Sequence, residues 1–416
     1  EDSEAPGWLL TGTETGAWAL HLSDGKGRYD YEPTAARQPI NDGKWHQLGF
    51  SFEGEKGELW MYYDGQNVAI YNTPGLKSLK SELRTVIGGT RAKWDYHGQW
   101  EAFNGYLDEI KIWDKVPEYQ LFENSFRNHF PERAPETSEM HGPLKVMAWN
   151  IWHGGRHFGK EVGVERVIET IRNSNADVIG MIETYGSGAI IADALGYHFY
   201  LISSNLSIMS RFPITETIQA FRPFNFGGAK IRLSNNQEMI YFNTWLHYLP
   251  DVKKSLFAGN TSASEQIKNE SDTRLAEVNQ VLAEIKPFLD QSDQVPVIMG
   301  GDFNTASHLD WTERTKAIHL DYVIEWPVTI SMEKAGFTDT YRAIYPDPLM
   351  WPGYSFWPYG RKGDTEKYLE SRIDYIFSQG EKLKTINATV LNYHPVMWPS
   401  DHAAAITEFQ FQAVKK

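Results

Sequence analysis

A segment rich in proline and glutamate, residues 131–143, divides this chain into two parts whose sequence patterns differ. The segment PERAPETSEMHGP contains three prolines and three glutamates and almost nothing apolar, which is typical of a linker. A chain of 416 residues is also too long for one ordinary domain. We therefore expect one domain over residues 1–130, a linker over 131–143 and a second domain over 144–416.

The first part consists of short runs in which apolar and polar residues alternate, broken by Gly, Asp and Asn. In GELWMYYDGQNVAIYN, two such runs flank Asp64-Gly65, which is a β-hairpin signal. The run FNGYLDEIKIWD, residues 103–114, has the same alternation. This pattern predicts an all-β sandwich.

From Leu144 onward, strand patterns alternate with helix patterns. Val164, Val167, Ile168 and Ile171 have the spacing of one helix face, and a second helix is expected within residues 271–289. Apolar runs of strand length surround both. The alternation predicts an α/β four-layer sandwich, with sheets inside and helices outside.

Composition excludes several kinds of site. The chain has no cysteine, so disulfides, zinc–thiolate sites and cysteine nucleophiles are ruled out. No run approaches 18 consecutive apolar residues, so we expect no transmembrane segment. The net charge of −14 does not favour tight binding to nucleic acid, although a nuclease with a local basic groove stays open. The chain starts at Glu1 with no readable targeting signal.

The apolar strands of the second part end in, or contain, carboxylates, carboxamides and imidazoles. These residues are Asn150, Glu183, His247, Asp302, Asn304, Asp374, Asp401 and His402. Asp302 and Asn304 point to the same side of one strand end, because side chains alternate along an extended chain. If these strand ends converge, they form a site rich in oxygen atoms.

Each of these residues also has a purely structural interpretation. A glutamate after a strand, such as Glu183, is usually solvated. Asp302 and Asn304 could form a turn that bonds its own backbone. Asp374 is harder to explain in this way, because it interrupts an apolar strand and a buried carboxylate without a partner is costly. Taken together, the residues favour a site for a hard cation such as Mg²⁺ or Mn²⁺ and the hydrolysis of a phosphate ester.

The motifs WN (149–150), IGMIET, IMSRFPI, NTWLHY, GGDFNT, SRIDYIF and SDHAAA occur in one order along residues 144–412. In this order they resemble the endonuclease/exonuclease/phosphatase superfamily. That metal-dependent group includes deoxyribonucleases, abasic-site endonucleases, inositol polyphosphate phosphatases and neutral sphingomyelinases. The resemblance implies the α/β sandwich and a role for each motif residue.

The resemblance implies that Glu183 is the principal metal ligand, with Asn150 beside it and Asp401 as a metal or phosphate-site ligand. It implies that Asp302 orients or deprotonates the attacking water and that Asn304 holds a phosphate oxygen. His402 would contact the phosphate, and Asp374 would pair with His402 and fix its tautomer. His247 matches the deoxyribonuclease and sphingomyelinase subgroup. The sequence does not decide whether Asp302 or His402 is the base, nor whether one or two metals act.

The chain departs from some superfamily members after Asn150, where NIWHGGRHFG lacks a second acid. Arg156 and His157 in this stretch are candidate substrate contacts, with a plain surface loop as the alternative. Two aromatic stretches, 345–361 and 394–402, contain Trp357 and Trp398. These tryptophans could stack against a substrate or simply fill the core under a loop.

The first part resembles laminin G-like and concanavalin A-like jelly-roll modules, through DGKWHQLGFSFEG and FNGYLDEIKIWDK. The coverage is partial, because the opening strands of such modules have no counterpart before Gly7, so the module is expected to be truncated or atypical. Such modules commonly bind glycans or cell surfaces, and some bind Ca²⁺. No ligand residues can be assigned, and a purely structural role stays open.

These observations predict a secreted, periplasmic or cell-surface phosphoesterase that depends on a divalent metal. A diesterase acting on a lipid or small-molecule phosphodiester is favoured, because few basic residues accompany the aromatic stretches. A secreted DNase-like endonuclease is the alternative. A non-catalytic binding protein on a hydrolase scaffold is a lesser one.

Overall fold

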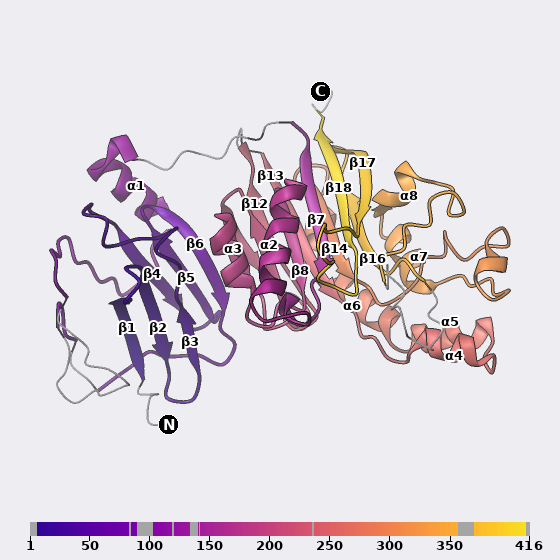
Figure 1. Ribbon diagram of the computed structural model, residues 1–416, viewed down its shortest axis with the longest axis horizontal. Coiled ribbons are helices and arrows are strands. Elements are labelled where there is room, and N and C mark those ends of the chain that lie inside the picture. Colours follow the sequence, from indigo (N-terminus) through magenta and orange to yellow (C-terminus); the bar gives the residue numbers. More distant parts are fainter. Residues whose placement is uncertain are drawn as a thin grey trace. The chain divides into compact units, whose positions relative to one another are not determined.

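The computed structural model describes residues 6–82, 85–89, 103–118, 120–133, 140, 142–234, 237–356 and 370–412 (Figure 1). The chain forms two compact units, Glu1–Glu136 and Thr137–Lys416. This division falls within the segment 131–143, which the sequence predicts as a linker.

The first unit is built from antiparallel strands, as expected for a jelly-roll-like domain. Its strands are β1 (Gly7–Gly12), β2 (Trp18–Ser23), β3 (Arg28–Tyr31), β4 (Leu48–Glu53), β5 (Glu58–Tyr63) and β6 (Gln66–Asn72). They pair in the orders β1-β2-β3 and β4-β5-β6. The predicted hairpin is confirmed: Asp64 and Gly65 connect β5 to β6, both with positive φ, as a two-residue type I′ turn requires.

Two segments of the first unit differ from the sequence-based expectation. The run 103–114 is not a strand, and Ile110, Ile112 and Trp113 in it are exposed. An alternating run becomes a strand only when a neighbouring strand pairs with it, and none of the strands in the described residues does so. The start of the predicted linker is a short 3₁₀ helix, η1 (Pro131–Arg133). Arg133 donates to the carbonyl oxygen of Trp45, so these residues pack on the first unit.

The second unit contains two mixed sheets. The strands of the first are β7 (Leu144–Asn150), β8 (Val178–Ile182), β9 (His198–Leu201), β10 (Leu206–Ser210), β17 (Leu383–Leu391) and β18 (Ala404–Phe411), in the order β17-β18-β7-β8-β10-β9. The strands of the second are β11 (Ile214–Ile218), β12 (Phe226–Arg232), β13 (Glu238–Trp245), β14 (Val297–Asp302), β15 (Thr338–Asp339) and β16 (Asp374–Gln379), in the order β11-β12-β13-β14-β16-β15. Within this unit, among the residues that the structure describes, β7 with β8 and β13 with β14 are the parallel pairs, and the other pairs are antiparallel.

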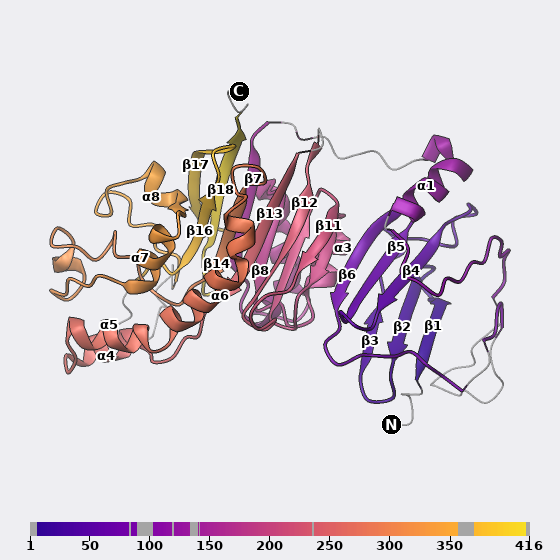
Figure 2. The same cartoon turned by 180° about the vertical axis from the view of Figure 1, so that it is seen from behind.

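Helices cover the outer faces of both sheets, which gives the predicted α/β sandwich. The helices are α1 (Gln120–His129, in the first unit), α2 (Val162–Ser174), α3 (Gly188–Leu195), α4 (Val252–Ala258), α5 (Ala263–Ser271), α6 (Arg274–Leu289), α7 (Pro327–Lys334) and α8 (Thr340–Ile344), with the 3₁₀ turns η2 (His153–Gly155) and η4 (Lys316–Ile318). α2 and α3 lie in front of the first sheet in Figure 1, and α6 lies over the second sheet in Figure 2. Among the helices of the described residues, none is long and apolar enough to cross a bilayer.

Both predicted helices are present. Val164, Val167, Ile168 and Ile171 of α2 are buried, as their spacing predicts. The second helix, α6, runs from Arg274 to Leu289, within the predicted residues 271–289, and it begins after Thr273, where the chain leaves helical geometry. Helix α6 packs its apolar face on the core of the second sheet.

The two sheets approach closely at two glycines. The Tyr241 hydroxyl of β13 lies where a Cβ atom on Gly180 or Gly300 would be, at 2.2 Å and 2.4 Å from those positions. Any larger residue there would displace the Tyr241 ring. Gly300 is the first glycine of the GGDFNT motif, and the next one, Gly301, has a φ of +147°. These glycines therefore set the spacing between the sheets directly before Asp302.

Strand register places the candidate residues at one end of the sandwich. Asn150 pairs with Ile182, the residue before Glu183, at the parallel ends of β7 and β8. Asp302 pairs with Trp245 on one side and with Asp374 on the other. Because β7 also contacts β14, the polar ends of both sheets meet there.

Candidate active site

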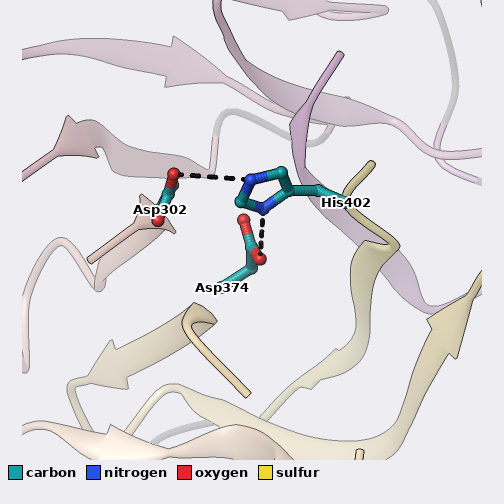
Figure 3. Close-up of side chains that lie close together, drawn as sticks. All are labelled: Asp302, Asp374 and His402. Carbon is teal, nitrogen blue, oxygen red and sulfur yellow. Dashed lines mark hydrogen bonds and ion pairs between the residues drawn. The ribbon is translucent and has the colours of Figure 1, made fainter. Parts of the chain in front are cut away.

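His402, Asp374 and Asp302 form the buried centre of the site. His402 Nδ1 lies 2.9 Å from Asp374 Oδ2, and His402 Nε2 lies 3.9 Å from Asp302 Oδ2 (Figure 3). The first distance is a hydrogen bond, and the second is too long for one. The three side chains come from the end of β14, the start of β16 and the turn before β18. Among the described residues, the imidazole is therefore anchored by a hydrogen bond at Nδ1 and not at Nε2.

The electrostatic effects within this centre are strong, because all three groups are buried. Burial by itself lowers the pKa of His402, but the carboxylates of Asp374 and Asp302 outweigh it and hold the pKa above its usual value. Burial raises the pKa of Asp302, although the nearby His402 opposes this shift. Both shifts favour the protonated form of the group concerned.

Two tryptophans fix the backbone of His402. The indole N–H groups of Trp149 and Trp398 donate to the carbonyl oxygen of His402, at 3.1 Å and 2.7 Å. Trp398 is 5% exposed and its ring lies against Trp149. The prediction of Trp398 as a substrate contact therefore does not fit its position, because its ring is packed inside and its polar atom is already bonded. Trp357, the other tryptophan predicted to contact substrate, lies outside the described residues.

Asn150 joins the two halves of the site. Its Nδ2 donates to Glu183 Oε1 at 3.3 Å and to Asp302 Oδ2 at 3.2 Å. Its Oδ1 accepts the amide of Trp152. Glu183 Oε2 accepts the amide of His153 at 2.9 Å. The predicted metal ligands Asn150 and Glu183 are therefore in direct contact.

Asp401 supplies the observation that best fits a bound cation. Its Oδ1 is buried and has no hydrogen-bond partner in the part of the chain that the structure describes. Burial raises the pKa of Asp401, and the nearby carboxylate of Glu183 adds to the shift. A buried acceptor near a second carboxylate matches the oxygen ligands that Mg²⁺ or Mn²⁺ prefers.

If distance were the only criterion, a different set of three residues would be chosen as the metal ligands. Single ligand atoms of Asp302, Asp374 and His402 lie within 4.8 Å of one another. However, His402 Nδ1 and Asp374 Oδ2 are already bonded to each other, so they serve as a histidine–carboxylate pair. Glu183, Asn150 and Asp401 are the better candidates for holding a metal.

Asn304 bonds to Asp302, and His247 is placed near it through its neighbour Leu246. Asn304 has a φ of +51°, its amide donates to Asp302 Oδ1, and its Nδ2 donates to the carbonyl oxygen of Leu246 at 2.9 Å. His247 follows Leu246; its side chain is exposed and its amide donates to Glu277. The hydrogen bond from the backbone of Asn304 to Asp302 is the one expected for a simple turn, and the same two residues also belong to the candidate site.

Aromatic and imidazole rings surround Glu183. His153, which is 65% exposed at its side chain, lies parallel to Tyr185 with ring centroids 6.0 Å apart. Trp152 stacks on His157 at 3.5 Å. Of the predicted contacts, His157 is thus engaged by Trp152, and Arg156 donates to the carbonyl oxygen of Tyr185 at 3.4 Å. Sequence reasoning missed His153, the histidine nearest Glu183, because nothing in the sequence ranks one loop histidine above another.

Sequence reasoning also missed Ser355, which is fully buried. Its hydroxyl lies 2.7 Å from Asp374 Oδ2. The next residue, Phe356, places its ring 4.9 Å from that of His402. The only signal available was the location of both residues in the aromatic stretch 345–361.

The comparisons agree with this geometry. The model of the family described as "Endonuclease/Exonuclease/phosphatase family" matches residues 147–402. This chain belongs to that family. Enzymes of the family are hydrolases that act on phosphoester bonds and use divalent metals. Residues 1–119 match the model of the "Concanavalin A-like lectin/glucanases superfamily".

Individual relatives are distant. A Caenorhabditis elegans protein, "Uncharacterized protein F14F9.5", is 27% identical over 296 residues, which cover 64% of this chain and 91% of that protein. The human Nocturnin catalytic domain with bound sulfate anion is 16% identical, over 65% of this chain and 94% of that one, with a TM-score of 0.45. An AP endonuclease from Archaeoglobus fulgidus is also 16% identical, over 65% of this chain and 100% of that one, with a TM-score of 0.45. At such scores, these structural likenesses support no statement about activity.

Proposed function

We propose that this protein is a phosphodiesterase that depends on a divalent metal and hydrolyses a lipid or small-molecule phosphodiester. The observation that carries the proposal is the arrangement around His402. One of its nitrogens is anchored on Asp374, and the other faces Asp302 without bonding to it. Both groups thus keep an atom for a reacting water or phosphate oxygen.

The roles follow from what each group can donate or accept. Asp302 is a buried carboxylate that can orient a water molecule or take its proton. His402 Nε2 can donate to a phosphate oxygen or receive a proton from water, so either group can act as the base. Asn304 has a second amide hydrogen left after its bond to Leu246, and it can donate this to a phosphate oxygen.

Glu183, Asn150 and Asp401 would hold the metal, Mg²⁺ or Mn²⁺. The ion supplies Lewis-acid polarisation of a phosphoryl oxygen and offsets the charge that develops during hydrolysis. The buried oxygen of Asp401 without a partner supports this assignment.

The rim around Glu183 supports a substrate that is not a polymer. His153 and Tyr185 present rings next to Glu183, and the rings of Trp152 and Phe158 continue this cluster. Arg156 is a cation at this rim, where it donates to the carbonyl oxygen of Tyr185. Rings suit an apolar or planar group on the phosphate, whereas a long DNA backbone requires many cations.

The test is turnover of bis-p-nitrophenyl phosphate by the full chain. We expect EDTA to abolish hydrolysis and added Mg²⁺ or Mn²⁺ to restore it. Hydrolysis that persists in the chelator would disprove the metal requirement. Absence of turnover on this ester, on phospholipids and on sphingomyelin-like lipids would favour the non-catalytic alternative.

The nuclease alternative has its own test. A DNase-like enzyme should nick supercoiled plasmid at low concentration, with activity that falls steeply as salt rises. Efficient nicking, together with no turnover of lipid or small diesters, would replace the proposed substrate class with DNA.

We further propose that the protein is secreted, periplasmic or on the cell surface, and that the first unit binds glycans or surfaces. The match to a concanavalin A-like model supports this. Binding of the full chain to a glycan array, with and without Ca²⁺, would test it. A blank array in both conditions would leave the unit a structural role.

A further inference from the structure

The carboxylate that anchors His402 is itself held by a buried serine. We propose that Ser355 is a positioning residue, which fixes the Asp374–His402 pair and couples it to the loop 345–356. This inference rests on the proposed function, because it assigns Ser355 a part in the same reaction.

The direction of each hydrogen bond at Ser355 follows from its partners. Its Oγ accepts the amide N–H of Ile373 at 3.0 Å and that of Asp374 at 2.9 Å. Backbone amides can only donate, so the single hydroxyl hydrogen is left for the third partner. That partner is Asp374 Oδ2, at 2.7 Å.

Asp374 Oδ2 therefore receives two hydrogens. One comes from Ser355, and the other comes from His402 Nδ1 at 2.9 Å. The second oxygen, Oδ1, is buried and has no partner among the described residues. The orientation of the carboxylate consequently depends on Oδ2, and the rotation of the imidazole depends on the carboxylate.

Ser355 also attaches this pair to a loop. Its carbonyl oxygen accepts the amide of Ala403, the residue after His402, at 2.7 Å, and its amide donates to Ser371. At the far end of the loop, Arg342 donates to the carbonyl oxygen of Tyr345 at 2.9 Å, and it also donates to those of Trp351 and Pro352. The loop is thus fixed at both ends, and Ser355 is its direct connection to the acid–base pair.

The loop brings further contacts to the site. The Phe356 ring lies against His402, while Leu349, Met350 and Trp351 are exposed on the same loop. A substrate group that presses on the exposed part would move the backbone that carries Ser355. Through the hydroxyl, such a shift would reach Asp374 and the ring of His402.

The test compares Ser355→Ala with a matched control, Thr340→Val. Thr340 is also fully buried, and its hydroxyl donates to Ile376 on β16, the strand that begins with Asp374. Both variants lose a buried hydroxyl next to the same strand, but only Ser355→Ala loses a bond to Asp374. We expect Ser355→Ala to lower kcat about 10- to 100-fold with KM within about twofold, and Thr340→Val to keep kcat within about twofold.

Two further variants separate positioning from packing. Ser355→Thr retains the hydroxyl and should recover most of kcat. Ser355→Cys retains the size of the side chain but has only a weak donor, so its kcat should fall as in Ser355→Ala. It provides the same test if the alanine variant does not fold. Wild-type kcat in both the Ala and Cys variants, or equal losses in Ser355→Ala and Thr340→Val, would overturn the proposal.

A spectroscopic measurement gives an answer that does not depend on activity. The His402 Nδ1 proton in its bond to Asp374 should give a downfield imidazole resonance, assigned by its loss in His402→Gln. We expect this resonance in the wild type, Ser355→Thr and Thr340→Val, and its loss or upfield shift in Ser355→Ala and Ser355→Cys. If the wild type hydrolysed no phosphodiester, the proposed function would fail while this measurement still decided the role of Ser355. An unchanged resonance in the Ala and Cys variants would refute that role.

Discussion

Each unit of this protein contains a histidine between two carboxylates, and the two arrangements differ in one distance. In the first unit, His46 Nδ1 lies 2.9 Å from Asp64 and Nε2 lies 2.9 Å from Asp42. In the second unit, His402 Nδ1 lies 2.9 Å from Asp374, but Nε2 lies 3.9 Å from Asp302. Both side chains are 6% exposed, so burial does not distinguish them.

Under the proposed function, this difference separates a structural cluster in the first unit from a reactive one in the second. His46 is bonded at both nitrogens, and Asp64 is bonded in addition to Arg133. The cluster ties the 42–46 segment, the β5–β6 hairpin and η1 together, and it leaves no imidazole atom for a ligand. His402 keeps its Nε2 for one. The same three side-chain types therefore support opposite functions, depending on whether the second hydrogen bond is made.

The comparison is tested most strongly by removing each imidazole. His402→Ala should lower kcat by at least about 10²-fold, because the group that faces Asp302 is lost. His46→Ala should leave kcat within about twofold. Steady-state hydrolysis of bis-p-nitrophenyl phosphate by the full chain measures both. Similar losses of kcat in the two variants would contradict the proposed difference between the His402 and His46 clusters.

Neutralising the anchoring carboxylates should give the next largest effect. Asp374→Asn should lower kcat about 10- to 100-fold, because an amide has one acceptor oxygen and can present its NH₂ group to His402. Asp64→Asn is the matched change in the first unit and should not alter kcat. A fully active Asp374→Asn enzyme would show that His402 does not depend on its anchor.

The cluster of His46, Asp42 and Asp64 should contribute to the stability of the protein rather than to its activity. His46→Ala leaves Asp42 and Asp64 without their shared donor, and removing a buried hydrogen-bonding partner costs about 1–3 kcal/mol. Thermal unfolding of the full chain should show a lower midpoint for this variant than for Lys44→Ala, which removes an exposed ion pair of the same Asp42. Equal midpoints would mean that the cluster contributes little to stability.

A buried acid outside both histidine clusters tests the effect of burial alone. Burial raises the pKa of Glu270 to about 7, although hydrogen bonds from Thr305 and Val328 oppose the shift. Between its unfolded pKa near 4.5 and pH 7, the folded state binds the extra proton, so stability should fall as pH rises. The slope is at most about 1.4 kcal/mol per pH unit, so the net effect over this window is at most about 3 kcal/mol.

Glu270→Gln should flatten this dependence, because an amide does not titrate. Its carbonyl oxygen can still accept the Val328 amide, and its NH₂ group can donate to Thr305. Unfolding midpoints measured from pH 5 to 8 check the expectation. A variant whose pH profile matches that of the wild type would contradict it.

Local patterns predicted the elements whose geometry is local. The i, i+3, i+4 spacing gave α2, and Asp64-Gly65 gave the β5–β6 turn. The carboxylate inside the apolar strand SRIDYIF correctly indicated a buried partner, which is His402. In the first two cases, the residues that determine the structure are neighbours in the sequence. In the third, the neighbours of Asp374 indicate only that it is buried, and its partner His402 lies 28 residues further along the chain.

The features that sequence reasoning missed depend on distant parts of the chain. The pairing of Asp302 with Asp374 depends on sheet register, because a shift of one strand by one residue would turn its aspartate to the other face of the sheet. Nothing in the sequence around Ser355 indicates a role for it, because its partner Asp374 comes from a different part of the chain. The run 103–114 has the alternation of a strand, but a strand also needs a neighbouring strand to pair with. The alternation within the run does not show whether such a neighbour exists.

The backbone after Asn150 has a consequence for any attempt to improve this protein. Trp152, His153, Gly154 and Gly155 all have positive φ, and so does Glu183. A non-glycine residue in this conformation costs roughly 1–2 kcal/mol. Glycine at 152 and 153 would relieve that cost and remove two rings beside Glu183. Selection for heat resistance alone would thus favour replacing the side chains that a screen for turnover should preserve.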